Sequence, residues 1–190
     1  MEHFIRRMRP EDYDGVNILM TILHEVHATN RPDLFKPALA PYDLEEFRGL
    51  LEDSSRIAYV AEVSGKIAGL CMASIHYPAE NPITYQIPYA YITDLCVLPS
   101  CQKQGIGKML FTHMEDFVKS LGIRQISLKV WAFNSSALSF YEDMGFSPRS
   151  YIMEKDLRSF SFLFMPQLWI ITASVPYHKL YITHLCNCSV

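Results

Sequence analysis

The sequence predicts one α+β domain built on a mixed β-sheet. Strand-like and helix-like segments follow in the order strand, two helices, three strands, helix, strand, helix, strand, with no internal repeat. A strand, a helix and a second strand in the middle of the chain are typical of a parallel crossover. With 190 residues, 49% of them hydrophobic and 19% charged, the chain can bury a sizeable core and does not resemble a disordered protein.

The first third of the chain holds a strand and two helices. Residues 3–8 read as a short strand, and Pro10 followed by two acidic residues is typical of a helix start. The apolar stripe of that helix consists of Val16, Leu19, Leu23 and Val26. The polar, proline-punctuated residues 29–42 predict a loop that is a candidate substrate wall, and a second helix is expected near residues 43–51.

Three strands follow. Residues 57–63 and 67–75 are apolar and β-branched on either side of Ser64-Gly65-Lys66, which predicts an antiparallel hairpin. After a proline-rich loop, residues 89–98 (YAYITDLCVL) are apolar enough for a strand buried on both faces.

The last part of the body alternates helices and strands. Apolar residues recur at helical spacing from Ile106 until Gly122, and residues 124–131 then alternate as a strand does. Asn134 can cap a further helix that Gly145 closes. A last strand is expected near residues 149–155.

Charge and cysteine content exclude several protein classes. A net charge of −3 gives no general attraction to nucleic acid or anionic membranes, and the first residues lack the apolar run of a secretory signal. The five cysteines are odd in number and have no zinc-like CxxC spacing. We therefore expect a cytoplasmic protein with reduced thiols, no disulfide framework and no nucleic-acid partner.

The C-terminal residues 159–190 differ from the body in composition. All 20 acidic residues and all 8 glycines precede them, and they hold one of the 17 Lys and Arg residues. We therefore divide the chain into a domain at 3–158 and an apolar extension of unknown role at 159–190. Pro166, Gln167 and Pro176 interrupt the apolar run, so we do not expect a membrane anchor. We interpret residues 159–190 as an extension that does not belong to the domain. The alternative is that they pack on the domain or on a partner subunit in a homodimer.

The stretch CQKQGIGKML, residues 101–110, joins the strand at 89–98 to the next helix. A strand, a glycine-containing turn and a helix N-terminus together bring free backbone N–H groups to one spot, which suits a phosphate. Its order, Gln-x-x-Gly-x-Gly, fits neither the Walker loop nor the Rossmann GxGxxG spacing. The alternative is an ordinary turn with helix-capping glycines.

The same stretch resembles the pyrophosphate loop of the GCN5-related N-acetyltransferases (the GNAT superfamily), Arg/Gln-x-x-Gly-x-Gly/Ala after a strand ending in hydrophobic-x-Pro. Val97-Leu98-Pro99 supplies that approach. Residues 134–146 (NSSALSFYEDMGF) resemble the family's Asn-x-x-Ala…Phe-Tyr-x-x-x-Gly-Phe stretch. The resemblance covers residues 3–157, most strongly 92–146, and departs in having Gln102 where Arg is commoner, which removes a charge near the phosphates.

The resemblance implies a GNAT fold, with about six to seven strands splayed at the cofactor site and about four flanking helices. It implies an acetyl-CoA-dependent N-acetyltransferase that moves an acetyl group directly to a primary amine of a small molecule or peptide, without a metal. The residues expected to bind the cofactor are Leu95, Cys96, Val97, Gln102, Lys103, Gln104, Gly105, Ile106, Gly107, Lys108 and Asn134. The alternative is a catalytically weak acyl-CoA-binding regulatory module.

Two residues are expected to carry the chemistry. By resemblance, Tyr141 is the general acid that protonates the leaving CoA thiolate, or else a core aromatic residue. The amine acceptor must lose a proton before it attacks, and Asp94 is the first candidate base because resembling polyamine-type enzymes carry an acid there. Glu62 and His76 are weaker candidates, and Asn134 could be a helix cap alone.

Two further constellations are weak. His24 and His27 could share a helix face as metal ligands, but their spacing is not that of HExxH and no third ligand is evident. Cys186-Asn187-Cys188 is equally weak evidence for a metal or redox site. We predict no metal.

Overall fold

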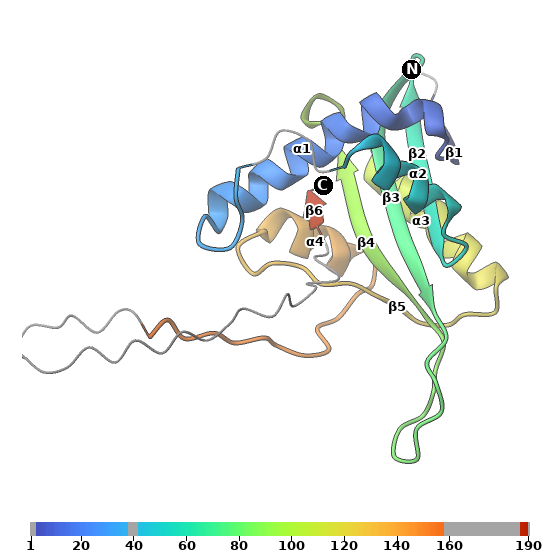
Figure 1. Cartoon of the computed structure of the whole chain (residues 1–190), viewed down its shortest axis with the longest axis vertical. Coiled ribbons are helices and arrows are strands. Elements are labelled where there is room, and N and C mark those ends of the chain that lie inside the picture. Colours follow the sequence, from blue (N-terminus) through green and yellow to red (C-terminus); the bar gives the residue numbers. More distant parts are fainter. Residues whose placement is uncertain (1–2, 38–41, 158–186, 190) are drawn as a thin grey trace, which may run out of the picture.

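The structure, a computed structural model, describes residues 3–37, 42–157 and 187–189 (Figure 1). Four α-helices surround a six-stranded mixed sheet in this part of the chain, which confirms the predicted α+β class. The helices are α1 (Tyr13–Asn30), α2 (Leu44–Glu52), α3 (Ile106–Ser120) and α4 (Ser135–Asp143), and the strands are β1 (His3–Arg7), β2 (Arg56–Val63), β3 (Lys66–His76), β4 (Tyr89–Val97), β5 (Ile126–Ser127) and β6 (Asn187–Ser189).

The sheet runs in the order β1-β2-β3-β4-β5, and β6 also pairs with β4. The pairs from β1 to β4 are antiparallel, including the predicted hairpin of β2 and β3. β5 and β6 both run parallel to β4. β5 lies beside Ala90 and Tyr91, and β6 lies beside residues 94–96, so the two strands share one edge of β4.

Alternation along the central strands divides the core into two layers. Cys71 and Leu95 face the cluster formed with α3 and α4, whereas Leu70 and Cys96 face the cluster formed with α1 and α2. All four side chains are fully buried. The central strands are therefore buried on both faces, as the continuous apolar run 89–98 predicted.

Local capping sets the helix ends. At the start of α2, the Asp43 carboxylate accepts a hydrogen bond from the Glu46 amide (2.8 Å), and the Glu46 carboxylate accepts one from the Asp43 amide (2.9 Å). Gly122 (φ 75°) and Gly145 (φ 88°) follow α3 and α4 in the left-handed conformation, as expected. Within the described residues, no helix has the length and apolarity that crossing a membrane requires.

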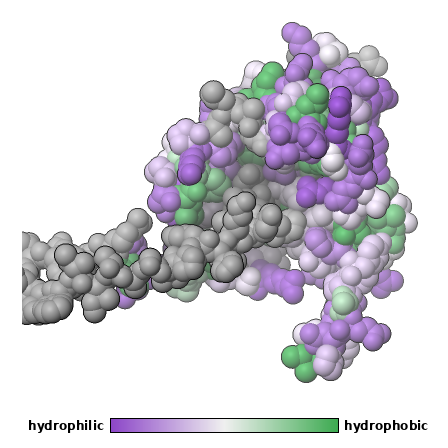
Figure 2. Space-filling view, in the orientation of Figure 1, coloured by the Kyte–Doolittle hydropathy of each residue, from purple (hydrophilic) through white to green (hydrophobic). Residues whose placement is uncertain are grey.

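The connection between β3 and β4 forms an arm that projects from the body (Figure 1). Ile83 is 88% exposed and Tyr85 is 95% exposed on this arm. The space-filling view shows a hydrophobic spot at its tip below a largely hydrophilic surface (Figure 2). The arm belongs to neither core layer.

Two predicted strands differ from the structure. The strand expected at 124–131 is shorter in the structure, Ile126–Ser127, because β4 pairs with β5 only at Ala90 and Tyr91. The strand expected near 149–155 is wrong: the segment has no ladder partner in the described chain, and Met153 is 92% exposed. Residues 124–131 alternate as a strand does, and residues 149–155 contain an apolar run (Tyr151-Ile152-Met153), but a strand also needs a neighbour to pair with. The apolar stretch 159–186 lies outside the described residues.

Gly69 marks the closest approach of β3 to its neighbours. A Cβ placed there would lie 3.0 Å from the carbonyl oxygen of Cys96 and 3.0 Å from Leu110. We expect Gly69→Ala to destabilise the protein by about 1–3 kcal/mol, measured by urea unfolding, because the backbone oxygen cannot move aside. Gly49→Ala is the matched control: it is helical with no neighbour within 4 Å and should stabilise by about 0.5–1 kcal/mol. Equal effects of the two variants would contradict the packing described.

Candidate functional site

The loop between β4 and α3 presents a run of backbone N–H groups. Residues Pro99–Cys101 form a 3-10 turn, Lys103 (φ 59°) and Gly105 (φ 83°) adopt left-handed conformations, and α3 begins at Ile106. In the described part of the chain, no hydrogen bond uses the amides of residues 103–108. Such a curved run of free amides at a helix N-terminus is geometrically suited to binding an anion.

Side chains of the loop leave these amides open. The Gln102 amide group donates to the carbonyl oxygen of Val97 (3.2 Å), and the Gln104 amide group donates to the carbonyl oxygen of Ser100 (3.1 Å). Lys103 and Lys108 are exposed. A Cβ at Gly105 would meet nothing within 4 Å, so the space above the backbone is free for an approaching group. The loop therefore brings together all the predicted residues from Gln102 to Lys108.

A β-bulge interrupts β4 just before Asp94. Met72 of β3 pairs with Asp94, and Ala73 pairs with Ile92, so Thr93 has no partner residue on β3. A bulge bends its strand and redirects the neighbouring side chains, and such bulges are common at functional sites. Asp94 is 5% exposed. Burial raises the pKa of its carboxyl group to about 7, against smaller lowering effects of a hydrogen bond from Thr93 and of the Arg56 charge.

Tyr42 is a neighbour of Asp94 that the sequence did not reveal. Burial raises the pKa of the Tyr42 phenol, and the Asp94 carboxylate raises it further. The Tyr42 carbonyl oxygen accepts hydrogen bonds from Tyr13 (3.1 Å) and Asn17 (3.0 Å) of α1, which hold the α1–α2 connection over this part of the sheet. Only the folded chain brings residue 42 to residue 94, so no local pattern could have identified it.

The β4 residues after Asp94 have buried side chains, so a ligand could pair only with their backbone edge. The side chains of Leu95, Cys96 and Val97 are at most 2% exposed, and the Cys96 thiol contacts the carbonyl oxygen of Leu19 at 3.6 Å. β5 has ended its pairing at Tyr91, and the edge from Asp94 to Cys96 pairs with β6. This edge and the amide-rich loop form one continuous path along β4.

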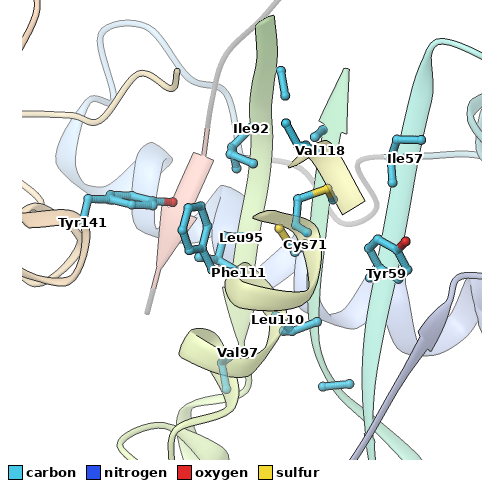
Figure 3. Packing of buried hydrophobic residues seen from close by; sticks show 14 of the residues in the cluster. Ile57, Tyr59, Cys71, Ile92, Leu95, Val97, Leu110, Phe111, Val118 and Tyr141 are labelled. Atoms are coloured by element: carbon cyan, nitrogen blue, oxygen red, sulfur yellow. The ribbon is translucent and has the colours of Figure 1, made fainter. Parts of the chain in front are cut away.

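Tyr141 lies on α4 across from this path. Its side chain is 2% exposed and packs edge-on against Phe140 and Phe146, with ring centroids 5.3 Å apart in each pair. In Figure 3 its hydroxyl points toward β4, with β6 in between. The Asn134 side chain accepts a hydrogen bond from the Ala137 amide (3.1 Å), so its capping role is confirmed.

The weaker base candidates lie elsewhere. Glu62 is on β2, two strands from β4, and forms an ion pair with Arg6 at 3.1 Å. His76 pairs with Tyr89 at the opposite end of β4 from the loop, stacks on its ring and contacts the Ser74 hydroxyl at 2.8 Å. Of the three acid–base candidates, Asp94 is the one on the strand that carries the loop, and it is buried with a raised pKa.

His27 belongs to an aromatic cluster that sequence patterns missed. Its ring is fully buried beside Phe35, Trp131 and Phe133, and neither of its nitrogens has a hydrogen-bond partner in the described chain. Burial lowers its pKa to about 4, and the charge of His24 adds to this. Among the described residues no group of three or more potential ligands could hold a metal ion. The side chains of Cys186 and Cys188 lie outside the described ones.

Comparison with known proteins points to one family. The model of the acetyltransferase (GNAT) family matches residues 20–146. A [ribosomal protein bS18]-alanine N-acetyltransferase of Salmonella typhimurium is 34% identical over 58 residues, which are 30% of this chain and 39% of that relative. The chain thus spans well under half the length of this relative.

Solved structures share the fold. A crystal structure of a tetramutant of the BH1408 protein from Bacillus halodurans has a TM-score of 0.78 and 27% identity, and the match covers 81% of this chain and 99% of that one. The aminoglycoside N-acetyltransferase AAC(6')-Iy, crystallised with CoA, has a TM-score of 0.63 and 18% identity over 83% of this chain and 95% of that one. The second similarity concerns the fold alone.

The raised pKa of Asp94 predicts a pH-dependent difference in stability between the wild type and Asp94→Asn. Well below pH 3.8 the carboxyl group is protonated in the folded and unfolded states alike. As the pH rises through 4 toward 7, the unfolded chain ionises first, so the wild type should lose up to about 4 kcal/mol relative to the variant, and the difference should level off once the pH exceeds the folded pKa of about 7. Urea unfolding of both proteins from pH 4 to 8 measures this. Parallel stability curves would contradict a buried Asp94 carboxyl group with a raised pKa.

Proposed function

Because this chain belongs to the acetyltransferase (GNAT) family, we propose that it is an N-acetyltransferase that moves an acetyl group from acetyl-CoA directly to a primary amine. One observation carries the proposal: a single strand, β4, leads from a buried carboxyl group of raised pKa to a loop of unpaired amides. An anionic cofactor held along this strand would place its reactive end near an acid–base group.

The donor is proposed to lie along β4. Its pyrophosphate would bind the amides of residues 103–108, with Lys103 and Lys108 as neighbouring positive charges. Its pantetheine arm would pair with the backbone of Leu95, Cys96 and Val97, and Asn134 would contact the arm from the start of α4. Gln102 would stabilise the loop through the hydrogen bond from its side-chain amide to the carbonyl oxygen of Val97.

Asp94 is proposed as the general base. A primary amine is protonated at neutral pH and becomes nucleophilic only after it loses a proton. A carboxylate with a pKa of about 7 can take that proton efficiently near neutral pH, whereas an ordinary carboxylate is too weak a base. The amine nitrogen then bonds to the thioester carbon as the carbon–sulfur bond breaks.

Tyr141 is proposed as the general acid. Its phenol would donate a proton to the CoA sulfur as the carbon–sulfur bond breaks, so that CoA leaves as a neutral thiol, which is a better leaving group than the thiolate. The rings of Phe140 and Phe146 hold the phenol in one orientation. In this mechanism Asp94 and Tyr141 approach the reacting carbon from different elements, β4 and α4.

The acceptor is proposed to be a primary amine of a small molecule or a peptide. The relative named for a ribosomal-protein alanine supports this class. The net charge of −3 mildly favours a cationic acceptor. Residues 3–158 are proposed as the catalytic unit, since one solved structure matches 81% of this chain over nearly its own whole length.

Tyr141→Phe tests the catalytic role directly. Thiol release from acetyl-CoA is first screened over small amines and peptides, and the best acceptor is used for the variants. We expect kcat to fall by about 10²-fold or more, because the leaving thiolate loses its proton donor. Tyr151→Phe, at a tyrosine that is 83% exposed, is the matched control and should be unchanged. A Tyr141→Phe rate within about twofold of wild type would remove this role, and donor binding without turnover on any amine would favour a binding module.

Gly105→Ala tests the anion loop. Gly105 and Gly122 both have positive φ and open surroundings, but they lie at opposite ends of α3. An alanine at either site strains the backbone, yet only the one at position 105 lies among the unpaired amides. We expect the calorimetric Kd for acetyl-CoA to rise about tenfold or more in Gly105→Ala and to stay within twofold in Gly122→Ala. Similar Kd values for both variants would place the phosphates elsewhere.

A further inference from the structure

The C-terminal strand β6 occupies the β4 edge at the candidate site. Its pairing is parallel and in register, with Asp94 opposite Asn187, Leu95 opposite Cys188 and Cys96 opposite Ser189. β6 is in contact with α1 and α4 as well as β4. Figure 3 shows the strand between Tyr141 and β4.

The β4 edge needs a partner at this point. β5 pairs only with Ala90 and Tyr91, and further along the same edge β6 is the strand that pairs with Asp94, Leu95 and Cys96. Buried N–H and C=O groups that lack partners are costly, so this edge attracts an extended chain or a ligand with amide groups. In this structure the extended chain is the protein's own C-terminal segment.

Resting on the proposed function, we propose that β6 is an intramolecular inhibitor that competes with acetyl-CoA for the β4 edge. The pantetheine arm contains amide groups and would pair with the backbone of Leu95 to Val97, whereas β6 pairs with residues 94–96. Both cannot use the same backbone groups of Leu95 and Cys96. Donor binding therefore requires β6 to leave.

The strength of this competition follows from tethering. A strand of three residues makes few ladder hydrogen bonds and would bind weakly as a separate peptide. Covalent attachment to the same chain makes its binding intramolecular and so raises its effective concentration at the β4 edge above that of a separate peptide. If nine molecules in ten hold β6 in place, the apparent Kd for acetyl-CoA is raised about tenfold.

The competition is reciprocal, because two ligands that exclude each other weaken each other's binding equally. A saturating donor must therefore release β6 from β4. The backbone amides of Asn187–Ser189 would then exchange their hydrogens faster, whereas the β3–β4 ladder would stay protected.

The test uses two double variants of the full chain. The first variant combines Asn187→Pro with Cys188→Pro and removes two adjacent backbone N–H groups. Because alternate residues of a strand direct their N–H groups to the same neighbour, one of these two groups faces β4, and its hydrogen bond is lost. Asn187→Ala with Cys188→Ala is the matched control, because it changes the same side chains and keeps both N–H groups. Neither pair belongs to the proposed catalytic or donor-binding residues.

Calorimetric titration with acetyl-CoA separates the outcomes. We expect the proline variant to bind about tenfold more tightly than the wild type and the alanine control, with a thermal midpoint lowered by no more than about 2–4 °C, because a contact held in nine molecules of ten stabilises the fold only slightly. Equal, measurable Kd values in all three proteins would overturn the inhibitor and leave the proposed function intact. Weaker binding with a lower thermal midpoint would also overturn it, because β6 would then be a fixed part of the fold. No binding to any of the three would refute the proposed donor site itself.

Hydrogen exchange of the wild type provides a second measurement that needs no variant. Protection of residues 187–189 should be lost on addition of saturating acetyl-CoA. Retained protection with the donor bound would overturn the competition.

Discussion

The burial of β4 on both faces is the constraint on which the rest of the molecule depends. Leu95 packs toward α3 and α4, and Cys96 packs toward α1 and α2, so the side chains of the strand are committed to the core. A ligand can therefore reach β4 only through its backbone edge, through the loop at its end, or through a break in its regular pairing. The structure has all three features within a few residues.

The bulge in β4 and the loop that follows this strand lie only a few residues apart. The bulge at Thr93 disturbs the alternation and keeps Asp94 within the protein, where its carboxyl group has a raised pKa. At the other end, two left-handed residues turn the chain so that α3 begins with its first amides unpaired. An acid–base group and an anion site are thus separated by only a short length of rigid strand, which fits a donor that has a phosphate end and a reactive end.

The open edge of β4 has several potential partners. β5 pairs with the first residues of β4, Ala90 and Tyr91, and β6 pairs with residues 94–96. The proposed donor would pair with backbone groups that β6 also uses. The physical requirement is the same in each case, since buried backbone groups must be paired. Which partner is bound decides whether the site is closed by the protein itself or available for chemistry.

The sequence by itself determined the helices, the hairpin and the glycine-containing loop, because these depend on local patterns. Hairpin residues 64–66, the left-handed Gly122 and Gly145, the two-faced strand at 89–98 and the loop at 102–108 are confirmed as structural features, since capping, turns and apolar periodicity act over a few residues. Only the tertiary structure decided which segments find neighbours. In the described part of the chain, residues 149–155 pair with no strand, whereas Asn187–Ser189 pair with β4. The charge of Asp94 raises the pKa of Tyr42. Strand pairing and pKa both depend on residues that are distant in the chain.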